Sequence, residues 1–175
     1  IKDQAERLCY IGPAMGSDVR SELAALIAEI TPDNISSSFF TTGGAAANEL
    51  AIRLARHFTG RSKILARYRS YHGSTGGTLS LTGDPRHHLT RADMPGVVRI
   101  LDPYVYRLST GHRDPADCPV CQGGPYLEEI LMYENPDSVA AVILESVVGT
   151  NGIIVPPDGY LQSIRETCSK YGILL

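Results

Sequence analysis

Short apolar runs typical of buried strands alternate with amphipathic stretches of helical spacing along most of this 175-residue chain. The clearest run is VAAVILE at 139–145, whose continuous apolar side chains are typical of a strand buried on both faces. Further runs at 63–68 and 96–101 lie between segments of helical periodicity. This alternation predicts an α/β fold with a mainly parallel sheet flanked by helices.

Apolar residues at three- and four-residue spacing predict helices in the segments between these runs. The helices expected from this spacing are 18–30, 45–58, 78–81, 125–135 and 160–171. Two further strands are expected, a short one at 38–42 and the beginning of one at 173–175. Residues 102–124 are rich in Pro, Gly, Asp and Cys without periodicity, so we expect an irregular excursion there.

Composition excludes several classes of partner. The hydrophobic fraction of 43% and the charged fraction of 20% are ordinary for a soluble globular protein. A net charge of −3 gives no reason to expect nucleic acid or a membrane surface as partner, and no apolar run approaches the roughly 20 residues that span a bilayer. Four scattered cysteines are not a disulfide framework, so we expect a cytoplasmic protein.

The first glycine-rich turn lies where a strand is expected to lead into the helix at 45–58. Gly43, Gly44 and Ala45 would let the backbone approach an anion, and the first N–H groups of a helix bind anions. The basic residues of the following stretch suit an anionic ligand; they are Arg53, Arg56, Arg61, Lys63, Arg67 and Arg69. A tight turn with a solvated basic face is the alternative interpretation. The familiar dinucleotide and P-loop glycine patterns are absent.

The second glycine-rich turn, SYHGSTGG, places Tyr71 and His72 just after a strand, at the same end of the predicted sheet. An aromatic ring there can stack on a flat ligand, and an imidazole can hydrogen-bond to it or stack on it. A phosphate cradle with a stacking aromatic suits pyridoxal phosphate. Taken singly, Tyr71 is better explained as a core aromatic and His72 as a turn histidine.

Three blocks of the sequence resemble consecutive blocks of the class III aminotransferases, which bind pyridoxal phosphate on the fold-type I scaffold. The blocks are FFTTGGAAANELAIRLARHFTGRSKIL, SYHGSTGGTLSLTG and VILESVVGTNGIIVPPDGYLQSIRETCSKYGILL. They cover most of the chain in the family's order. The resemblance implies that residues 1–175 are the central part of the large, cofactor-binding domain, truncated at both ends. It also implies a homodimer that transfers an amino group from an amine or ω-amino acid to a 2-oxo acid.

The resemblance also implies the roles of individual residues. Backbone amides of the first turn hold the cofactor phosphate, Tyr71 stacks on the ring beside His72, and Glu145 ends the strand next to the cofactor. The implied cofactor-binding residues are Gly43, Gly44, Ala45, Tyr71, His72 and Glu145.

The sequence departs from the family pattern at several positions. Ala45 supplies an amide without a hydroxyl, Ala46 stands where the family usually has glutamate, and Ser146 stands where it commonly has proline. The family's ring-nitrogen aspartate and Schiff-base lysine would follow the last residues of this chain. We therefore assign no catalytic residue and no metal ligand within 1–175, and expect this segment alone to be inactive.

Other functions remain open at this point. His112, Cys118 and Cys121 resemble a zinc half-site, which would make the loop at 102–124 a metal-binding or interaction module. Ser74 near His72 suggests a hydrolase, although the spacing of a nucleophile elbow is not met. Another fold-type I enzyme, such as a decarboxylase or racemase, fits the same alternation of strands and helices. The identity of donor and acceptor is not encoded in these motifs.

Overall fold

The computed structural model describes residues 1–12, 14–32, 34–89, 93–108 and 111–175. Contacts divide the chain into two compact units, Ile1–Phe40 and Thr41–Leu175. The prediction that 1–175 belong to one large domain stays a prediction. The elements in chain order are α1 (Lys2–Arg7), α2 (Asp18–Ile30), α3 (Gly44–Thr59), β1 (Lys63–Arg67), α4 (Gly76–Leu81), η1 (Pro85–Leu89), β2 (Val97–Ile100), η2 (Val105–Arg107), η3 (Pro115–Asp117), η4 (Pro119–Gln122), α5 (Gly124–Glu134), η5 (Pro136–Ser138), β3 (Val139–Ile143) and α6 (Tyr160–Lys170).

The first unit contains α1 and α2, and α2 has the bounds predicted from its apolar spacing. The helix begins after Ser17 and ends at Thr31. The backbone N–H and the hydroxyl of Thr31 both donate to the carbonyl of Ile27, at 3.1 and 2.9 Å. These bonds close the last helical turn just before Pro32, which disfavours helical geometry in the residue preceding it.

The strand predicted at 38–42 is wrong, because these residues form neither a strand nor a bridge. Phe39 is 75% exposed, and no strand in the described part of the chain pairs with the segment. An extended segment becomes a strand only when a neighbour satisfies its N–H and C=O groups. The aromatic and threonine residues have strand propensity, but propensity alone does not supply that neighbour.

The second unit is built on a parallel sheet with strand order β2-β1-β3. Ile64 of β1 pairs with Val97 of β2 on one side and with Ala141 of β3 on the other. Beyond β3, the strand predicted at 173–175 is present as a single parallel bridge between Leu174 and Ala141. The predicted α/β architecture with a parallel sheet is therefore confirmed.

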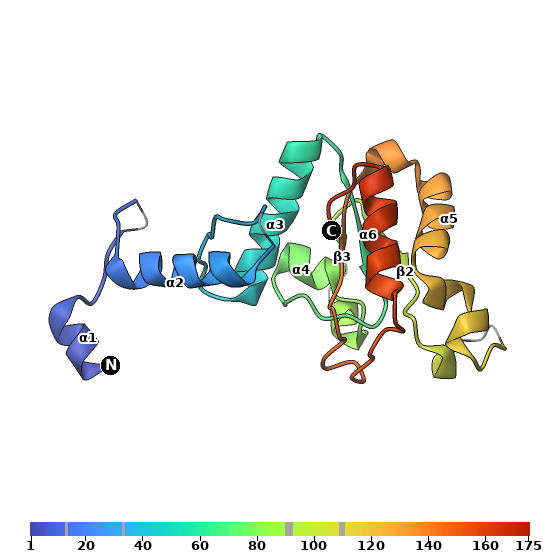
Figure 1. Cartoon of the computed structure of the whole chain (residues 1–175), viewed down its shortest axis with the longest axis horizontal. Coiled ribbons are helices and arrows are strands. Elements are labelled where there is room, and N and C mark those ends of the chain that lie inside the picture. The colour runs from blue at the N-terminus through green and yellow to red at the C-terminus, as the bar shows by residue number, and fades with distance from the viewer. Residues whose placement is uncertain (13, 33, 90–92, 109–110) are drawn as a thin grey trace. The chain divides into compact units, whose positions relative to one another are not determined.

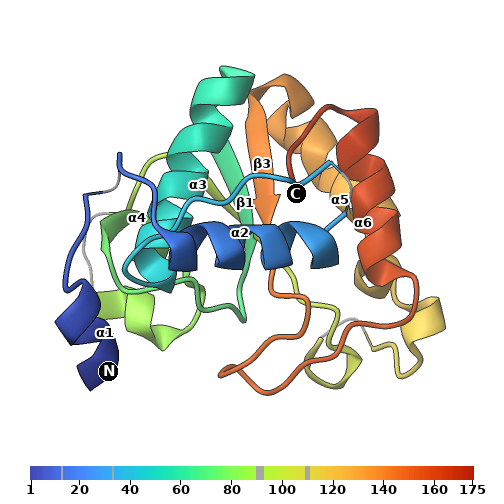
Figure 2. The same ribbon diagram turned by 60° about the vertical axis from the view of Figure 1, so that its left-hand side comes forward.

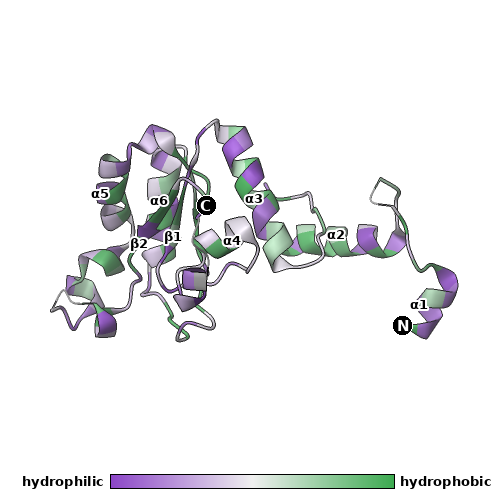
Figure 3. Ribbon diagram, turned by 180° about the vertical axis from the view of Figure 1, so that it is seen from behind, coloured by the Kyte–Doolittle hydropathy of each residue, from purple (hydrophilic) through white to green (hydrophobic). Residues whose placement is uncertain are grey.

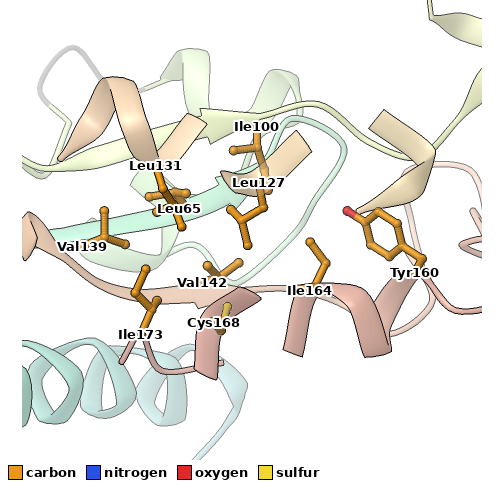
Figure 4. Packing of buried hydrophobic residues seen from close by; sticks show 10 residues of the cluster. All are labelled: Leu65, Ile100, Leu127, Leu131, Val139, Val142, Tyr160, Ile164, Cys168 and Ile173. Carbon is orange, nitrogen blue, oxygen red and sulfur yellow. The ribbon is translucent and has the colours of Figure 1, made fainter. Parts of the chain in front are cut away.

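Helices cover both faces of this sheet, with α3 and α4 on one face and α5 and α6 on the other (Figures 1 and 2). The side chains of β1 alternate between the two faces, since Ile64 and Ala66 pack with α3 while Leu65 packs with α5 and α6. Figure 4 shows the larger cluster, in which strand residues and residues of α5 and α6 point toward one another. Burial on both faces explains why the strands read as continuous apolar runs.

Helix α3 is amphipathic, with hydrophobic and hydrophilic residues in alternation along it (Figure 3). Ile52 and Ala55 are buried against the sheet, while Arg53 is exposed. Gly60 ends the helix in the left-handed conformation, with φ of 68°, as predicted. Because α3 leads directly into β1, its N-terminus lies toward the carboxyl end of the sheet.

The predicted helix starts lie within two residues of those observed. Helix α5 begins at Gly124, one residue before Pro125, while α6 begins at Tyr160 as predicted. The excursion at 102–124 contains three short 3-10 turns within its described residues. None of the helices in the described ranges has the length and apolar character that crossing a bilayer requires.

Candidate functional site

The carboxyl ends of the three parallel strands bring together residues that are far apart in the sequence. The chain leads from β1 into Tyr71 and His72, from β2 into Asp102, and from β3 into Glu145. In open α/β sheets, ligands bind at this edge, where strand ends meet helix N-termini.

The N-terminus of α3 presents open backbone amides at this edge. The first helical hydrogen bond joins the N–H of Ala47 to the carbonyl of Gly43 (3.0 Å), so the N–H groups of Gly44, Ala45 and Ala46 have no partner within the helix. No side chain caps the helix, and its first turn holds no acidic residue. A Cβ atom added to Gly43 or Gly44 would meet no atom of the described residues within 4 Å. Open space next to free amides and a positive helix end is suited to an anion.

The second glycine turn packs directly on the first. The side-chain amide of Asn48 donates to the carbonyl of His72 at 2.8 Å. Gly73 has φ of 135°, and a Cβ atom there would lie 2.8 Å from the Cβ of Ala45 and 2.6 Å from Oγ1 of Thr78. Only glycine fits this position, because both the backbone angle and the space exclude a side chain. The two turns predicted to share one edge of the sheet are in contact.

Glu49 fixes the far end of the second turn. Its Oε1 accepts hydrogen bonds from the Thr75 hydroxyl (2.6 Å) and from the N–H groups of Gly77 (2.8 Å) and Thr78 (3.1 Å). The hydrogen bond from Thr75 lowers the pKa of this carboxyl, as do those from the two amides. The ionised carboxylate therefore ties α3 to the start of α4.

Glu145 joins the second turn to the loop after β3. Its Oε1 accepts the N–H of Tyr71 and its Oε2 accepts the N–H of Gly149, each at 2.9 Å. The backbone of Tyr71 is thereby held at the end of β3, although the two residues are 74 positions apart. Glu145 is thus a bridging carboxylate rather than an isolated strand-end acid.

Tyr71 and His72 occupy different environments. The Tyr71 side chain is half-buried, with the guanidinium of Arg86 over its ring. His72 is buried, its backbone N–H donates to Oγ1 of Thr82 (3.0 Å), and its Nε2 has no hydrogen-bond partner among the described residues. Burial lowers the pKa of His72 to about 4, so the imidazole is neutral at neutral pH.

These residues fit a ligand that carries both a phosphate and a flat ring. The open amides at Gly44 and Ala45 suit the phosphate, and the half-buried ring of Tyr71 suits the flat ring. The unpartnered Nε2 of His72 supplies a polar atom to the same edge. All six residues predicted to bind the cofactor lie in this one constellation; their roles in binding stay predictions.

Comparisons with known proteins place the whole chain in one family. The family model for Aminotransferase class-III matches residues 1–175. The chain belongs to the class III aminotransferases. It is 33% identical over its full length to a hypotaurine/taurine–pyruvate aminotransferase of Paracoccus denitrificans, of which it covers 39%. It is 36% identical, over 87% of its length, to a putrescine–pyruvate aminotransferase of Pseudomonas aeruginosa, of which it covers 35%.

Solved structures of class III aminotransferases share this fold. A taurine:2-oxoglutarate aminotransferase from Bifidobacterium kashiwanohense, in complex with pyridoxal phosphate and glutamate, superposes with a TM-score of 0.87 at 43% identity. An (S)-enantioselective ω-transaminase from Thermomicrobium roseum gives a TM-score of 0.88 at 37% identity. Each comparison covers 99% of this chain and 40% of the other, so the chain spans about two-fifths of its relatives' length.

In this class III aminotransferase chain, three of the arginines predicted to suit an anion hydrogen-bond to backbone carbonyls of the chain itself. Arg56 donates to the carbonyls of Ser62 and Pro95, and Arg61 donates to three carbonyls of the β3 and α6 segments. Arg67 is fully buried and donates to the carbonyl of Glu145. These arginines satisfy backbone acceptors at strand and helix ends, which charge counting cannot distinguish from ligand binding.

Sequence reasoning missed the residues that connect the two turns. Asn48 and Glu49 follow the first glycine turn immediately, and Asn48 is one helical turn after Gly44, which places it on the same helix face. This helical spacing is the sequence feature from which Asn48 could have been identified. Most partners of these side chains could not be identified from the sequence, because apart from the Thr75 hydroxyl they are backbone groups of the second turn.

The zinc site and the hydrolase site that the sequence left open are not assembled in the described residues. Cys118 and Cys121 are buried with Val120 in a small apolar cluster, and no three potential metal ligands gather anywhere in the described ranges. Burial, with the neighbouring thiol of Cys118, raises the pKa of Cys121 to about 12, which disfavours the thiolate that zinc requires. Ser74 is exposed, and among the described residues no hydrogen bond joins it to His72.

Proposed function

We propose that the whole protein to which this chain belongs is a pyridoxal-phosphate-dependent aminotransferase. It moves an amino group from an amine or ω-amino acid donor to a 2-oxo acid such as pyruvate. The single observation that carries the proposal is the packing of the two glycine turns, which sets open α3 amides beside Tyr71 and Glu145. The named activities of the relatives, on taurine, hypotaurine and putrescine with pyruvate, support the same donor and acceptor classes.

The residues of this chain bind and orient the cofactor. The amides of Gly44 and Ala45 donate to its phosphate, and Gly43 leaves room for the phosphate to approach. Tyr71 stacks on its ring, and the neutral His72 lies next to Tyr71 with its Nε2 available for hydrogen bonding. Glu145 holds the Tyr71 backbone in place at the end of β3.

Bound pyridoxal phosphate supplies an electron sink for the amino-group transfer. This chain contributes preorganisation, because hydrogen bonds already join α3 to the second turn and the second turn to the loop after β3. Asn48 donates to the carbonyl of His72, and Glu145 accepts the N–H groups of Tyr71 and Gly149. In this proposal the residues of this chain bind and orient the cofactor, and none of them is assigned a proton transfer.

The test is an absorbance titration of the whole protein with pyridoxal phosphate. We expect a band near the visible edge that bleaches when taurine, putrescine or another primary amine is added and returns with pyruvate. A folded whole protein that shows no such band refutes the cofactor assignment. A band that forms but does not respond to amines and pyruvate keeps the cofactor and refutes the aminotransferase reaction.

We also propose that the whole protein is a cytoplasmic homodimer. All four cysteines are free thiols, which suits a reducing compartment. Size-exclusion chromatography with light scattering tests the dimer, and a monomeric mass for the active protein would overturn it. Fractionation of the source cells tests the compartment.

A further inference from the structure

Arg86 contacts the ring of Tyr71 from a separate turn of the chain. It lies in η1, just after α4, and its Cζ atom is 4.1 Å from the ring centroid of Tyr71. A guanidinium at this distance is attracted to the negative face of an aromatic ring. Neither the sequence patterns nor the family resemblance gave Arg86 a part in the site.

The guanidinium is held in this place by two other side chains, Asp84 and Thr150. Arg86 Nε donates to both carboxylate oxygens of Asp84, at 2.9 and 2.8 Å, and Nη2 donates to the same carboxylate. Nη2 also donates to the hydroxyl of Thr150 at 3.0 Å. The Asp84 side chain is 4% exposed and receives a further hydrogen bond from the Asn151 amide at 3.1 Å. A planar guanidinium that donates hydrogen bonds to two fixed acceptor groups has one preferred orientation.

The charge of the pair is also balanced. The hydrogen bond from Arg86 lowers the pKa of Asp84 to about 2, so the carboxylate is ionised throughout the neutral range. The two ionised groups lie in hydrogen-bond contact, which limits the net field that they exert on the Tyr71 ring.

Tyr71 is consequently held at two points. Glu145 fixes its backbone through the N–H, and Arg86 covers one face of its ring. A planar ligand can stack only on the opposite face. The loop after β3 also helps to hold Tyr71 in place. Glu145 accepts the N–H of Gly149 in this loop, and the Asp84–Arg86 pair hydrogen-bonds to the next two residues, Thr150 and Asn151.

We infer that Arg86, held by Asp84 and Thr150, is a positioning residue that sets the orientation of the Tyr71 ring for stacking on the cofactor. This inference rests on the proposed function. Arg86 does not touch the reacting atoms in this role; it acts through Tyr71 alone.

The test is a double-mutant cycle in the whole protein that measures the dissociation constant of pyridoxal phosphate. We expect Arg86→Met to weaken binding by about threefold, the worth of an exposed cation–π contact, and to have no effect in a Tyr71→Ala background. The visible circular dichroism of the bound cofactor should change in Arg86→Met, because it reports the tilt of the ring. Arg107→Met, which removes the exposed cation–π contact with the Tyr106 ring at 5.0 Å, is the matched control and should change neither quantity.

Two results would overturn the inference while leaving the proposed function intact. One is an Arg86→Met variant that binds the cofactor with wild-type affinity and circular dichroism. The other is an equal loss of affinity in the wild-type and Tyr71→Ala backgrounds, which would mean that Arg86 acts independently of Tyr71. If Arg86→Met does not fold, Thr150→Val removes a single contact to the guanidinium and should give a smaller loss that also vanishes in the Tyr71→Ala background. Failure of the wild-type protein to bind pyridoxal phosphate would instead refute the proposed function.

Discussion

The two glycine turns look alike in the sequence and differ in the structure. At the first turn, a Cβ atom on Gly43 or Gly44 would meet nothing within 4 Å. At the second turn, a Cβ atom on Gly73 would lie 2.6 Å from Thr78 Oγ1, and one on Gly77 would lie 2.5 Å from Glu49 Oε2. Gly73 is therefore required by packing within the chain, and a side chain at Gly77 would displace the Glu49 carboxylate. Gly43 and Gly44 of the first turn, like Gly76 of the second, border space that the described residues do not fill.

This difference separates two reasons for a glycine near a binding site. A glycine required by packing reports how the fold is assembled, and its substitution should reduce stability. A glycine that faces open space next to free amides is compatible with a ligand, and its substitution should reduce binding instead. The four predictions that follow challenge this separation.

The largest effect is expected for Gly73→Ala. The added Cβ meets Ala45 and Thr78 at a φ of 135°, so we expect a loss of roughly 3 kcal/mol in the free energy of unfolding. Urea denaturation of the whole protein measures it. Gly60→Ala is the control with a positive φ of 68° and no neighbour within 4 Å, and it should cost only about 1 kcal/mol. Equal losses in the two variants would remove the packing argument for the second turn.

Acid should destabilise the second turn through His72. Its pKa is about 4 in the folded protein against 6.5 for an unperturbed histidine, so the unfolded chain binds more protons between these values. The free energy of unfolding should fall by about 3 kcal/mol from this residue as the pH drops from 6.5 to 4. Urea denaturation across that range should show a shallower fall for His72→Gln, while the exposed His57→Gln should match the wild type. Identical pH profiles for all three proteins would contradict the buried, neutral His72.

Gly44→Val should reduce binding without reducing stability. The branched side chain would occupy open space next to the free amides, so the free energy of unfolding should stay within about 0.5 kcal/mol. The affinity for pyridoxal phosphate should fall by about tenfold or more, because charge-assisted hydrogen bonds to the amides are obstructed. Fluorescence titration measures the affinity, and Gly16→Val, also in open space, is the control. A variant that binds normally would show that the first turn does not hold the phosphate.

The smallest effect is expected for Ala45→Ser. A hydroxyl at the first turn can donate one more hydrogen bond to a phosphate, which is worth roughly 1 kcal/mol, or about fivefold in affinity. The same titration measures the gain. Ala47→Ser, at an exposed position of α3, should leave the affinity unchanged. An Ala45→Ser variant that binds more weakly would indicate that the contact with Gly73 tolerates no larger side chain.

The sequence predicted the layers of the fold because apolar periodicity records burial on one or both faces. Helices α2 and α3 and strands β1, β2 and β3 follow from that pattern, and Gly60 ends α3 as expected. The strand predicted at 38–42 failed because pairing depends on a neighbour that the local sequence does not specify.

The candidate site was predictable in its residues and less so in its connections. The glycine turns, Tyr71, His72 and Glu145 were identified from their positions after strands and from the family resemblance. The hydrogen bonds that join them, from Asn48 to His72 and from Tyr71 to Glu145, involve backbone groups, which every residue carries. Arg67 donates to the Glu145 carbonyl and Arg86 to the Asp84 carboxylate, contacts that a count of charges cannot show.

The hydrogen bond from Asn48 to the His72 carbonyl also fixes the rotation of α3 about its own axis. An α-helix turns by about 100° per residue, so a slip of one residue would swing its leading amides through more than a quarter of a circle. Asn48 is not one of the residues assigned to the ligand. Its hydrogen bond nevertheless sets the direction in which the leading amides of α3 point. The direction of the proposed anion site therefore depends on a residue one helical turn further along α3, whose hydrogen-bond partner is the second glycine turn.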